Sequence, residues 1–134
     1  EVAPRSIGGL CGRILEHSLG MSLEALILRH LVGDPQPVAA AGGGAGVMMI
    51  PIPRRGIYNR VHGVAAARAV PGVTGVTITA QPGQSVAPPP AGSSYLGFIF
   101  ASAASPEEAE AALRQAHAQL RFEIRTGLPA EGPA

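Results

Sequence analysis

The sequence contains no lysine, no tryptophan and a single cysteine, Cys11. Because a Schiff base and the common ammonium clamp on a phosphate both need a lysine, this chain supplies neither. One cysteine excludes an internal disulfide framework, so the cytoplasm is the compartment that we expect. Aromatic residues make up only 4% of the chain, so its core must consist mainly of aliphatic side chains.

Charged residues are equally scarce. They account for 14% of the 134 residues, the formal net charge is +1, and Arg54-Arg55 is the one pair of adjacent arginines. Binding to a phosphate backbone needs a concentrated basic face, so we expect no nucleic-acid partner. No apolar run approaches the roughly 20 residues that a membrane span needs, so we expect no membrane partner either.

The first third of the chain predicts two helices and a loop. Gly20 is expected to end the first helix and Ser22 to cap the second. Residues 34–46, DPQPVAAAGGGAG, are rich in Gly, Ala and Pro and predict a flexible loop. The glycine run is not typical of a phosphate-binding turn, because it precedes a strand-like segment and no lysine follows it.

From Val47 the pattern changes to strands joined by short turns. Four strands are predicted, in the segments VMMIPIP, GIYNRVHG, GVTITA and YLGFIFASA. VAAARAV predicts a short helix, and Ser105, Pro106 and Glu108 predict the capped start of a final helix. The order β-β-α-β-β-α after two N-terminal helices predicts an α+β fold, with a mainly antiparallel four-stranded sheet covered by helices.

These segments divide the chain into four parts: residues 1–33 with the two helices, a loop at 34–46, an α+β subdomain at 47–125 and a disordered tail at 126–134. VMMIPIP is apolar and contains Pro51 and Pro53, as is typical of an edge strand. An exposed apolar edge of this kind is a candidate homodimer contact.

The first nine residues, EVAPRSIGG, carry the most chemistry. On an extended segment Glu1, Ala3 and Arg5 share one face, and Gly8 and Gly9 lead into the first predicted helix. A carboxylate can hold Mg²⁺, a guanidinium can clamp a phosphate or carboxylate, and glycine N–H groups can approach an oxyanion. The residues alone favour such a platform no more than an exposed strand end with an ordinary helix entry.

EVAPRSIGG resembles the end of the active site of ATP-grasp ligases, where a strand usually reads Glu-x-Asn-x-Arg and runs into Gly-Gly. GMSLEALILRHLVG is similar to the helix that follows in that family. YLGFIFASAASPEEAEAALRQAHAQL is similar to the closing strand and helix of its L-amino acid ligase-like, biotin carboxylase-like and carbamoyl-phosphate synthase-like members. The resemblance covers nearly the whole chain, although only the first nine residues carry its chemistry.

The resemblance implies that residues 1–33 hold the end of the active-site strand and the helices after it. It implies Glu1 as a ligand of Mg²⁺ and Arg5 as the clamp on the ATP-derived phosphate or the substrate carboxylate. Gly8 and Gly9 would shape the turn at the acyl acceptor. Ala3 departs from the family pattern, because a methyl group cannot coordinate Mg²⁺ as the usual Asn does.

The resemblance further implies the C-terminal portion of a ligase that joins a carboxylate to an amine through an acyl-phosphate, using Mg²⁺ and ATP. The lysines that hold ATP in this family lie upstream, so the isolated chain is expected to be inactive. Its expected partners are the remainder of the enzyme and small carboxylate and amine substrates. The alternative, which Ala3 and the missing lysines favour for the isolated chain, is a non-catalytic α+β binding or dimerisation module.

Overall fold

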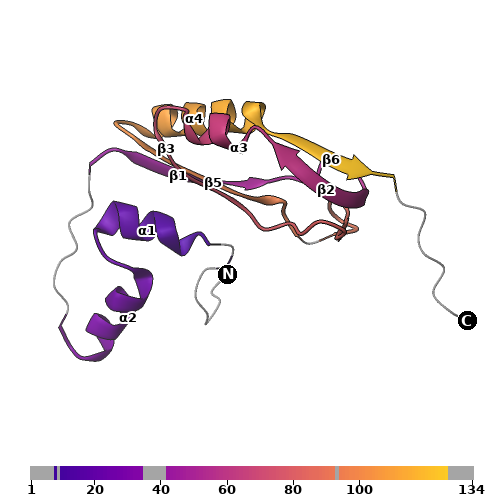
Figure 1. The fold of residues 1–134 in the computed structure, drawn as a ribbon. Coiled ribbons are helices and arrows are strands. Elements are labelled where there is room, and N and C mark those ends of the chain that lie inside the picture. Colours follow the sequence, from indigo (N-terminus) through magenta and orange to yellow (C-terminus); the bar gives the residue numbers. More distant parts are fainter. Residues whose placement is uncertain (1–7, 9, 35–41, 93, 127–134) are drawn as a thin grey trace, which may run out of the picture.

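The computed structural model of the protein describes residues 8, 10–34, 42–92 and 94–126 (Figure 1). Within these residues the elements are α1 (Gly12–Leu19), α2 (Leu23–Leu31), β1 (Gly44–Ile50), β2 (Gly56–His62), α3 (Val64–Arg68), β3 (Val73–Ile78), β4 (Ser85–Val86), β5 (Gly97–Ala103), α4 (Pro106–Gln119) and β6 (Arg121–Arg125). None of the helices among the described residues combines the length and apolarity needed to cross a bilayer.

The end of α1 and the start of α2 agree with the prediction from the sequence. Gly20 follows α1 with φ 67°, a left-handed conformation that costs glycine little. The Ser22 hydroxyl caps α2 by accepting a hydrogen bond of 3.2 Å from the backbone N–H of Ala25. Both helix ends are therefore fixed by residues next to them in the sequence.

The strands form two antiparallel three-stranded sheets: sheet A has the order β1-β5-β3, and sheet B has the order β4-β2-β6. The α+β class is confirmed, and so is the antiparallel pairing. The expected single four-stranded sheet is corrected, because β2 pairs with β4 and β6 and belongs to a sheet of its own.

Two features of the sequence explain this correction. β1 stops pairing at Ile50, directly before Pro51, and a proline lacks the N–H that a ladder needs. Strand β6, which pairs with β2, was not predicted, because RFEIR is short and only Leu120 separates it from α4. β4 has two residues and is too short to show a period.

The predicted loop at 34–46 also needs a correction, because β1 already begins at Gly44. A Cβ atom on Gly44 would overlap the backbone of Ser105 and Pro106 at the start of α4. The glycine run therefore includes a close approach of two backbones, and the strand starts inside it.

Helix α4 covers one face of sheet A. The Ser105 hydroxyl accepts a 3.2 Å hydrogen bond from the N–H of Glu108, and the Glu108 carboxylate accepts one from the N–H of Ala104. This is the predicted capping box, with its return bond one residue earlier than the usual N-cap N–H. The apolar face of α4 packs into the core, and its buried residues, together with Leu120 directly after the helix, are Ala109, Ala112, Leu113 and Ala116.

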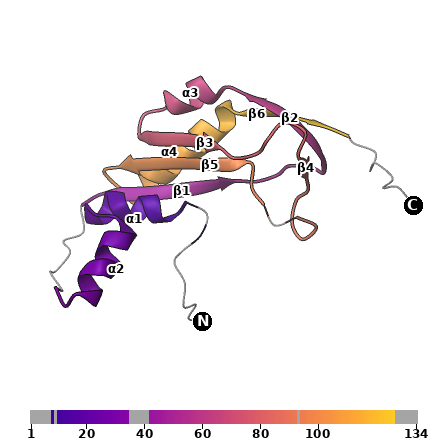
Figure 2. The same cartoon turned by 60° about the horizontal axis from the view of Figure 1, so that its bottom comes forward.

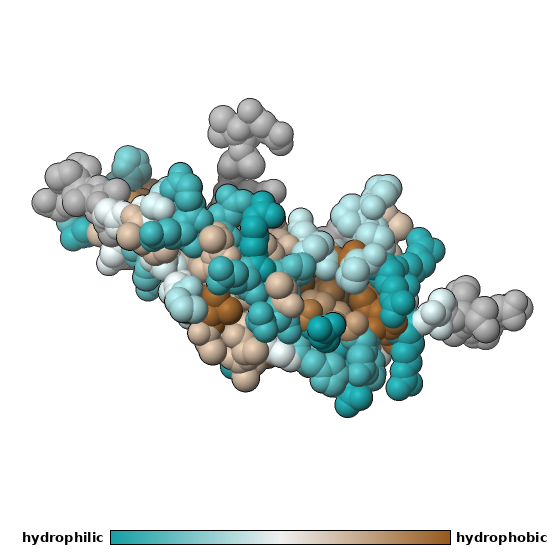
Figure 3. Space-filling view, turned by 90° about the horizontal axis from the view of Figure 1, so that it is seen from above, coloured by the Kyte–Doolittle hydropathy of each residue, from teal (hydrophilic) through white to brown (hydrophobic). Residues whose placement is uncertain are grey.

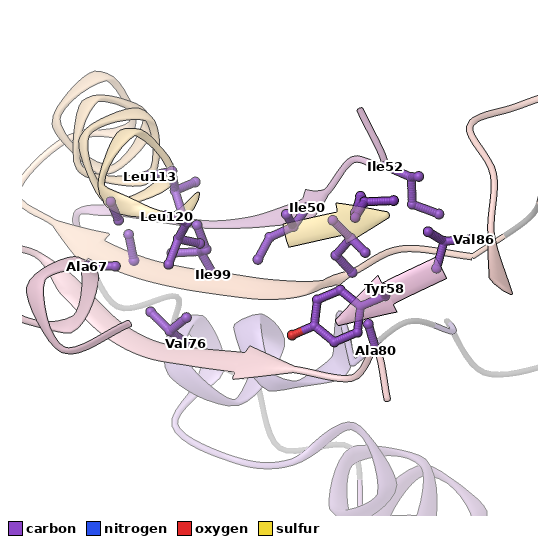
Figure 4. Close-up of a cluster of buried hydrophobic side chains, with 14 of the residues drawn as sticks. Ile50, Ile52, Tyr58, Ala67, Val76, Ala80, Val86, Ile99, Leu113 and Leu120 are labelled. Carbon is purple, nitrogen blue, oxygen red and sulfur yellow. The ribbon is translucent and has the colours of Figure 1, made fainter. Parts of the chain in front are cut away.

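The buried side chains form one cluster that extends from sheet A to sheet B (Figure 4). Ile50 and Ile99 of sheet A are fully buried. Ile99 lies beside Leu120 below α4, and Tyr58 of sheet B lies beside Ala80. The two sheets therefore share a core. The surface above α4 mixes hydrophilic side chains with smaller apolar areas (Figure 3).

Helix α1 lies on the face of sheet A that α4 does not cover, and α2 extends away from the sheet (Figures 1 and 2). α1 contacts β1, and α2 contacts α1. Sheet A is therefore the middle of three layers, with α3 and α4 on one side and α1 on the other.

Candidate functional site

Of the four residues that the sequence singles out, the structure describes one. Glu1, Arg5 and Gly9 lie outside the described residues, and their roles stay predictions. Gly8 is exposed, and a Cβ atom on it would meet no other atom within 4 Å. Its carbonyl accepts a 3.4 Å hydrogen bond from the N–H of Cys11, so Gly8 opens the turn into α1.

The described residues do not form a metal centre. No group of three or more His, Cys, Asp or Glu side chains gathers among them in a way that could hold a metal ion. The described residues therefore do not fit a Mg²⁺ site by themselves. The expectation for Mg²⁺ rests on Glu1 alone.

Helix α1 and the uncovered face of sheet A enclose a hollow of about 130 Å³, here called the α1 hollow. Its lining includes Arg13, Ile14 and His17 from α1 and Ala45, Gly75 and Phe100 from β1, β3 and β5. Arg13 and His17 are four residues apart, so they lie on the same side of the helix. A cation, a histidine and a sheet surface that contains glycine therefore meet in the α1 hollow.

The strand residues of the α1 hollow are placed by the register of sheet A. Phe100 of β5 pairs with Gly75 of β3, and the register shifts between Val73 and Gly75, so Thr74 is an additional residue opposite β5. The guanidinium carbon of Arg13 lies 5.7 Å from the centre of the Phe100 ring. This distance is within the range of a cation–π contact, which holds the arginine over the strand.

Two further hollows share lining residues with the α1 hollow. A second hollow, of about 60 Å³, is lined by His17, Ser18, Ser102 and the backbone of residues 42–45. A third, of about 280 Å³, is lined by Arg13, Glu16 and Glu24 among others. Its two carboxylates make this third hollow less favourable for an anion than the α1 hollow.

A separate polar cluster lies on the outer face of sheet B. Glu123 of β6 accepts hydrogen bonds of 2.9 Å from Arg60 Nε and 3.0 Å from Asn59 Nδ2, and its other oxygen lies 2.8 Å from His62 Nε2. The hydrogen bond from Arg60, followed by those of His62 and Asn59, lowers the pKa of Glu123 from 4.5 to about 2. The carboxylate therefore stays ionised far into the acidic range.

A β-bulge brings these side chains together. The register of β2 against β6 shifts between Tyr58 and Arg60, so Asn59 is an additional residue in β2. A bulge places two consecutive side chains on the same face, and Asn59 therefore joins Arg60 and His62 opposite Glu123. The cluster is exposed and binds together two strands of sheet B.

Neither the α1 hollow nor the Glu123 cluster was predicted. The spacing of Arg13 and His17 on a predicted helix was visible, but nothing in the sequence places Phe100 or Gly75 beneath them. Phe122 and Ile124 alternate with Arg121, Glu123 and Arg125 in a strand-like way. That alternation was the available signal for β6 and for the cluster.

Comparison with known proteins reveals two similarities. The family model of the L-amino acid ligase C-terminal domain 2 matches residues 48–125. The crystal structure of L-amino acid ligase from Bacillus licheniformis is similar to this structure, with a TM-score of 0.73 and 24% sequence identity. The similarity covers 88% of this chain and 30% of the ligase chain, so the protein spans less than a third of that ligase. No curated protein matches the chain.

Proposed function

The chain belongs to the family of the L-amino acid ligase C-terminal domain 2, and on that premise we propose that it is the C-terminal portion of an ATP-grasp ligase. The whole enzyme would activate a carboxylate as an acyl-phosphate and pass the acyl group to an amine. The match over residues 48–125 carries the proposal, and the likeness in fold to the Bacillus ligase supports it. An ATP-consuming enzyme of this kind is expected in the cytoplasm.

The surface of α2 supports a larger protein around this chain. Ile27, Leu28, Leu31 and Val32 lie on one side of the helix and are 44%, 62%, 73% and 77% exposed. Single exposed apolar residues are common, but four neighbours on one helix face mark a contact surface. We place the remainder of the ligase against this surface.

The roles of the first residues are part of the proposal. Arg5 would hold an anionic oxygen of the phosphate or of the substrate carboxylate. Gly8 and Gly9 would let backbone N–H groups approach the acyl acceptor, and Glu1 would be one metal ligand. Because the chain has no lysine and its described residues hold no metal site, ATP and Mg²⁺ would be bound mostly by the remainder of the enzyme. The chain alone would be inactive.

The test is the ligase activity of the full-length protein that contains this chain. Release of phosphate from ATP, dependent on a pair of amino acids, is expected for the wild type. Arg5→Ala should lower that rate on the order of 100-fold without changing the melting temperature. Arg114→Ala, which removes an equal charge from the exposed Glu110 ion pair, should leave the rate unchanged. Wild-type turnover in Arg5→Ala removes Arg5 from the mechanism, and a wild type without amino-acid-dependent ATP hydrolysis contradicts the ligase function.

A second function is favoured by the position of β1. It is an edge strand of sheet A, and Met49 on it is 40% exposed. A second copy could add to this edge, and the chain would then be a non-catalytic dimerisation module. Light scattering of the chain tests this: a dimer that Met49→Lys converts to a monomer supports it, and a wild-type monomer contradicts it.

A further inference from the structure

The α1 hollow has the composition of a small binding site. One wall is the helix that carries Arg13, and the other is a sheet surface with Phe100 and the side-chain-free Gly75. We propose that this hollow binds a small aliphatic carboxylate, with its oxygens on the guanidinium of Arg13 and its short chain against the Phe100 ring. The proposal goes beyond the ligase function and does not depend on it.

The first argument is the charge of Arg13. None of the ion pairs among the described residues includes Arg13, and its guanidinium carbon lies over the Phe100 ring, 5.7 Å from the ring centre. A cation–π contact uses none of the guanidinium N–H donors, and two of these donors can bind both oxygens of a carboxylate. Arg13 also lines the hollow of Glu16 and Glu24, but none of the ion pairs among the described residues joins it to either carboxylate.

The second argument is the size and the nature of the hollow. Its volume of about 130 Å³ is close to the ~150 Å³ of an apolar protein cavity that accommodates benzene, so a ligand of about six non-hydrogen atoms fits. Ile14, Ala45 and Phe100 provide apolar walls for a short chain. Few polar groups beside apolar walls are typical of a small-molecule site. A short aliphatic carboxylate matches these walls better than a phosphate, which has no apolar part.

The third argument is the absence of a side chain at Gly75. A Cβ atom there would lie 3.6 Å from Phe100 Cδ2, an ordinary van der Waals contact. The residue thus has room for a side chain, and a larger one would extend along Phe100 into the hollow. Gly75→Val is therefore a substitution that fills the site.

The experiment is a titration of the isotope-labelled chain with sodium propionate, followed by NMR. Sodium chloride keeps the ionic strength constant, and propionamide serves as an uncharged probe of the same shape. Propionate should cause saturable shifts at the amides of Arg13, His17 and Gly75, and propionamide should cause none. Inorganic phosphate should bind at least about tenfold more weakly than propionate, because it cannot use the apolar walls.

Three variants sharpen the titration. Arg13→Gln, at an exposed position, should weaken propionate binding at least about tenfold, because a charged hydrogen bond is lost. Gly75→Val should weaken it similarly while Arg13 is intact. Arg114→Gln removes a distant positive charge and should bind propionate like the wild type. Wild-type shifts that do not saturate, or affinities that are unchanged in Arg13→Gln, overturn the proposal. Should Gly75→Val not fold, Arg13→Gln alone decides.

The same data separate a carboxylate site from a general anion site. Equal affinities for phosphate and propionate would mean that Arg13 attracts any anion and that the Phe100 wall has no role, which overturns the proposal. The result leaves the ligase function untouched in either case, because the ligase test follows amino-acid-dependent ATP hydrolysis in the full-length protein.

Discussion

Helices α2 and α4 are alike in the sequence and opposite in the fold. α2 and α4 both have a serine N-cap and a periodic apolar face. α4 buries Ala109, Ala112, Leu113 and Ala116 against sheet A, whereas α2 buries no residue, and its Leu31 is 73% exposed. Amphipathic periodicity therefore shows that a helix has an apolar face, but not that this chain covers it.

This difference divides the protein into a self-sufficient part and a dependent one. Residues 42–126 contain both sheets, α3, α4 and every residue of the buried cluster. The family match at 48–125 lies within the same part. The α1–α2 segment contributes a wall of the α1 hollow and an exposed apolar surface, and it has no buried residue in either helix.

The largest expected difference in unfolding free energy comes from truncating one apolar side chain on α4 and one on α2. Leu113→Ala should cost about 2–5 kcal/mol of unfolding free energy, because Leu113 is 7% exposed in the core beneath α4. Leu28→Ala, at 62% exposure on α2, should change it by less than about 0.5 kcal/mol. Urea denaturation followed by circular dichroism measures both. Equal losses would mean that α2 is part of the same cooperative core.

The two helix caps give an intermediate effect. Ser105→Ala should destabilise the protein by about 1 kcal/mol, since Glu108 loses its cap and α4 is part of the core. Ser22→Ala removes the equivalent bond to Ala25, but it should lower only the helicity of α2 and leave the main unfolding midpoint in place. Thermal melts of both variants, followed by circular dichroism, provide the measurement. The midpoint reports the main unfolding transition, and the ellipticity below that transition reports the helicity of α2. A lower main midpoint in Ser22→Ala would contradict the division.

The smallest effect concerns the polar cluster within the self-sufficient part. The pKa of Glu123 is lowered from 4.5 to about 2, so its stabilising contribution is fully present above pH 4.5 and is lost as the pH falls towards 2. Glu123→Gln should therefore be less stable than the wild type at pH 6, and the difference should shrink at pH 2.5. Urea midpoints at the two pH values measure this. Glu110→Gln, in an exposed pair with Arg114, is the matched control. If the difference in stability between Glu123→Gln and the wild type is the same at both pH values, the hydrogen bonds to the ionised carboxylate are not its cause.

Local signals predicted most of the helices and four strands, but not the sheet that each strand joins. β5 and β3 were predicted from apolar and alternating residues, and both occur in sheet A. β6 was missed because the chain passes from α4 into it through Leu120 alone. Without β6, β2 had no partner other than β1, and a single four-stranded sheet was the consequence.

The candidate site was predictable only where the residues are adjacent in the sequence. Gly8 was expected before a helix, and it opens the turn into α1. Arg13 and Phe100 are far apart in the sequence, and their contact depends on how α1 lies on sheet A. The spacing of residues within one helix or strand therefore could not predict this contact.

The sequence by itself determined the ends of the helices, the absence of lysine chemistry and the resemblance to the C-terminal part of a ligase. Those features depend on residue identity and on neighbours within one helical turn, where a cap or a missing amine acts directly. The tertiary structure alone decided the division into two sheets, the low pKa of Glu123 and the α1 hollow. Each of these depends on pairing and packing between distant segments, which short-range preferences leave open.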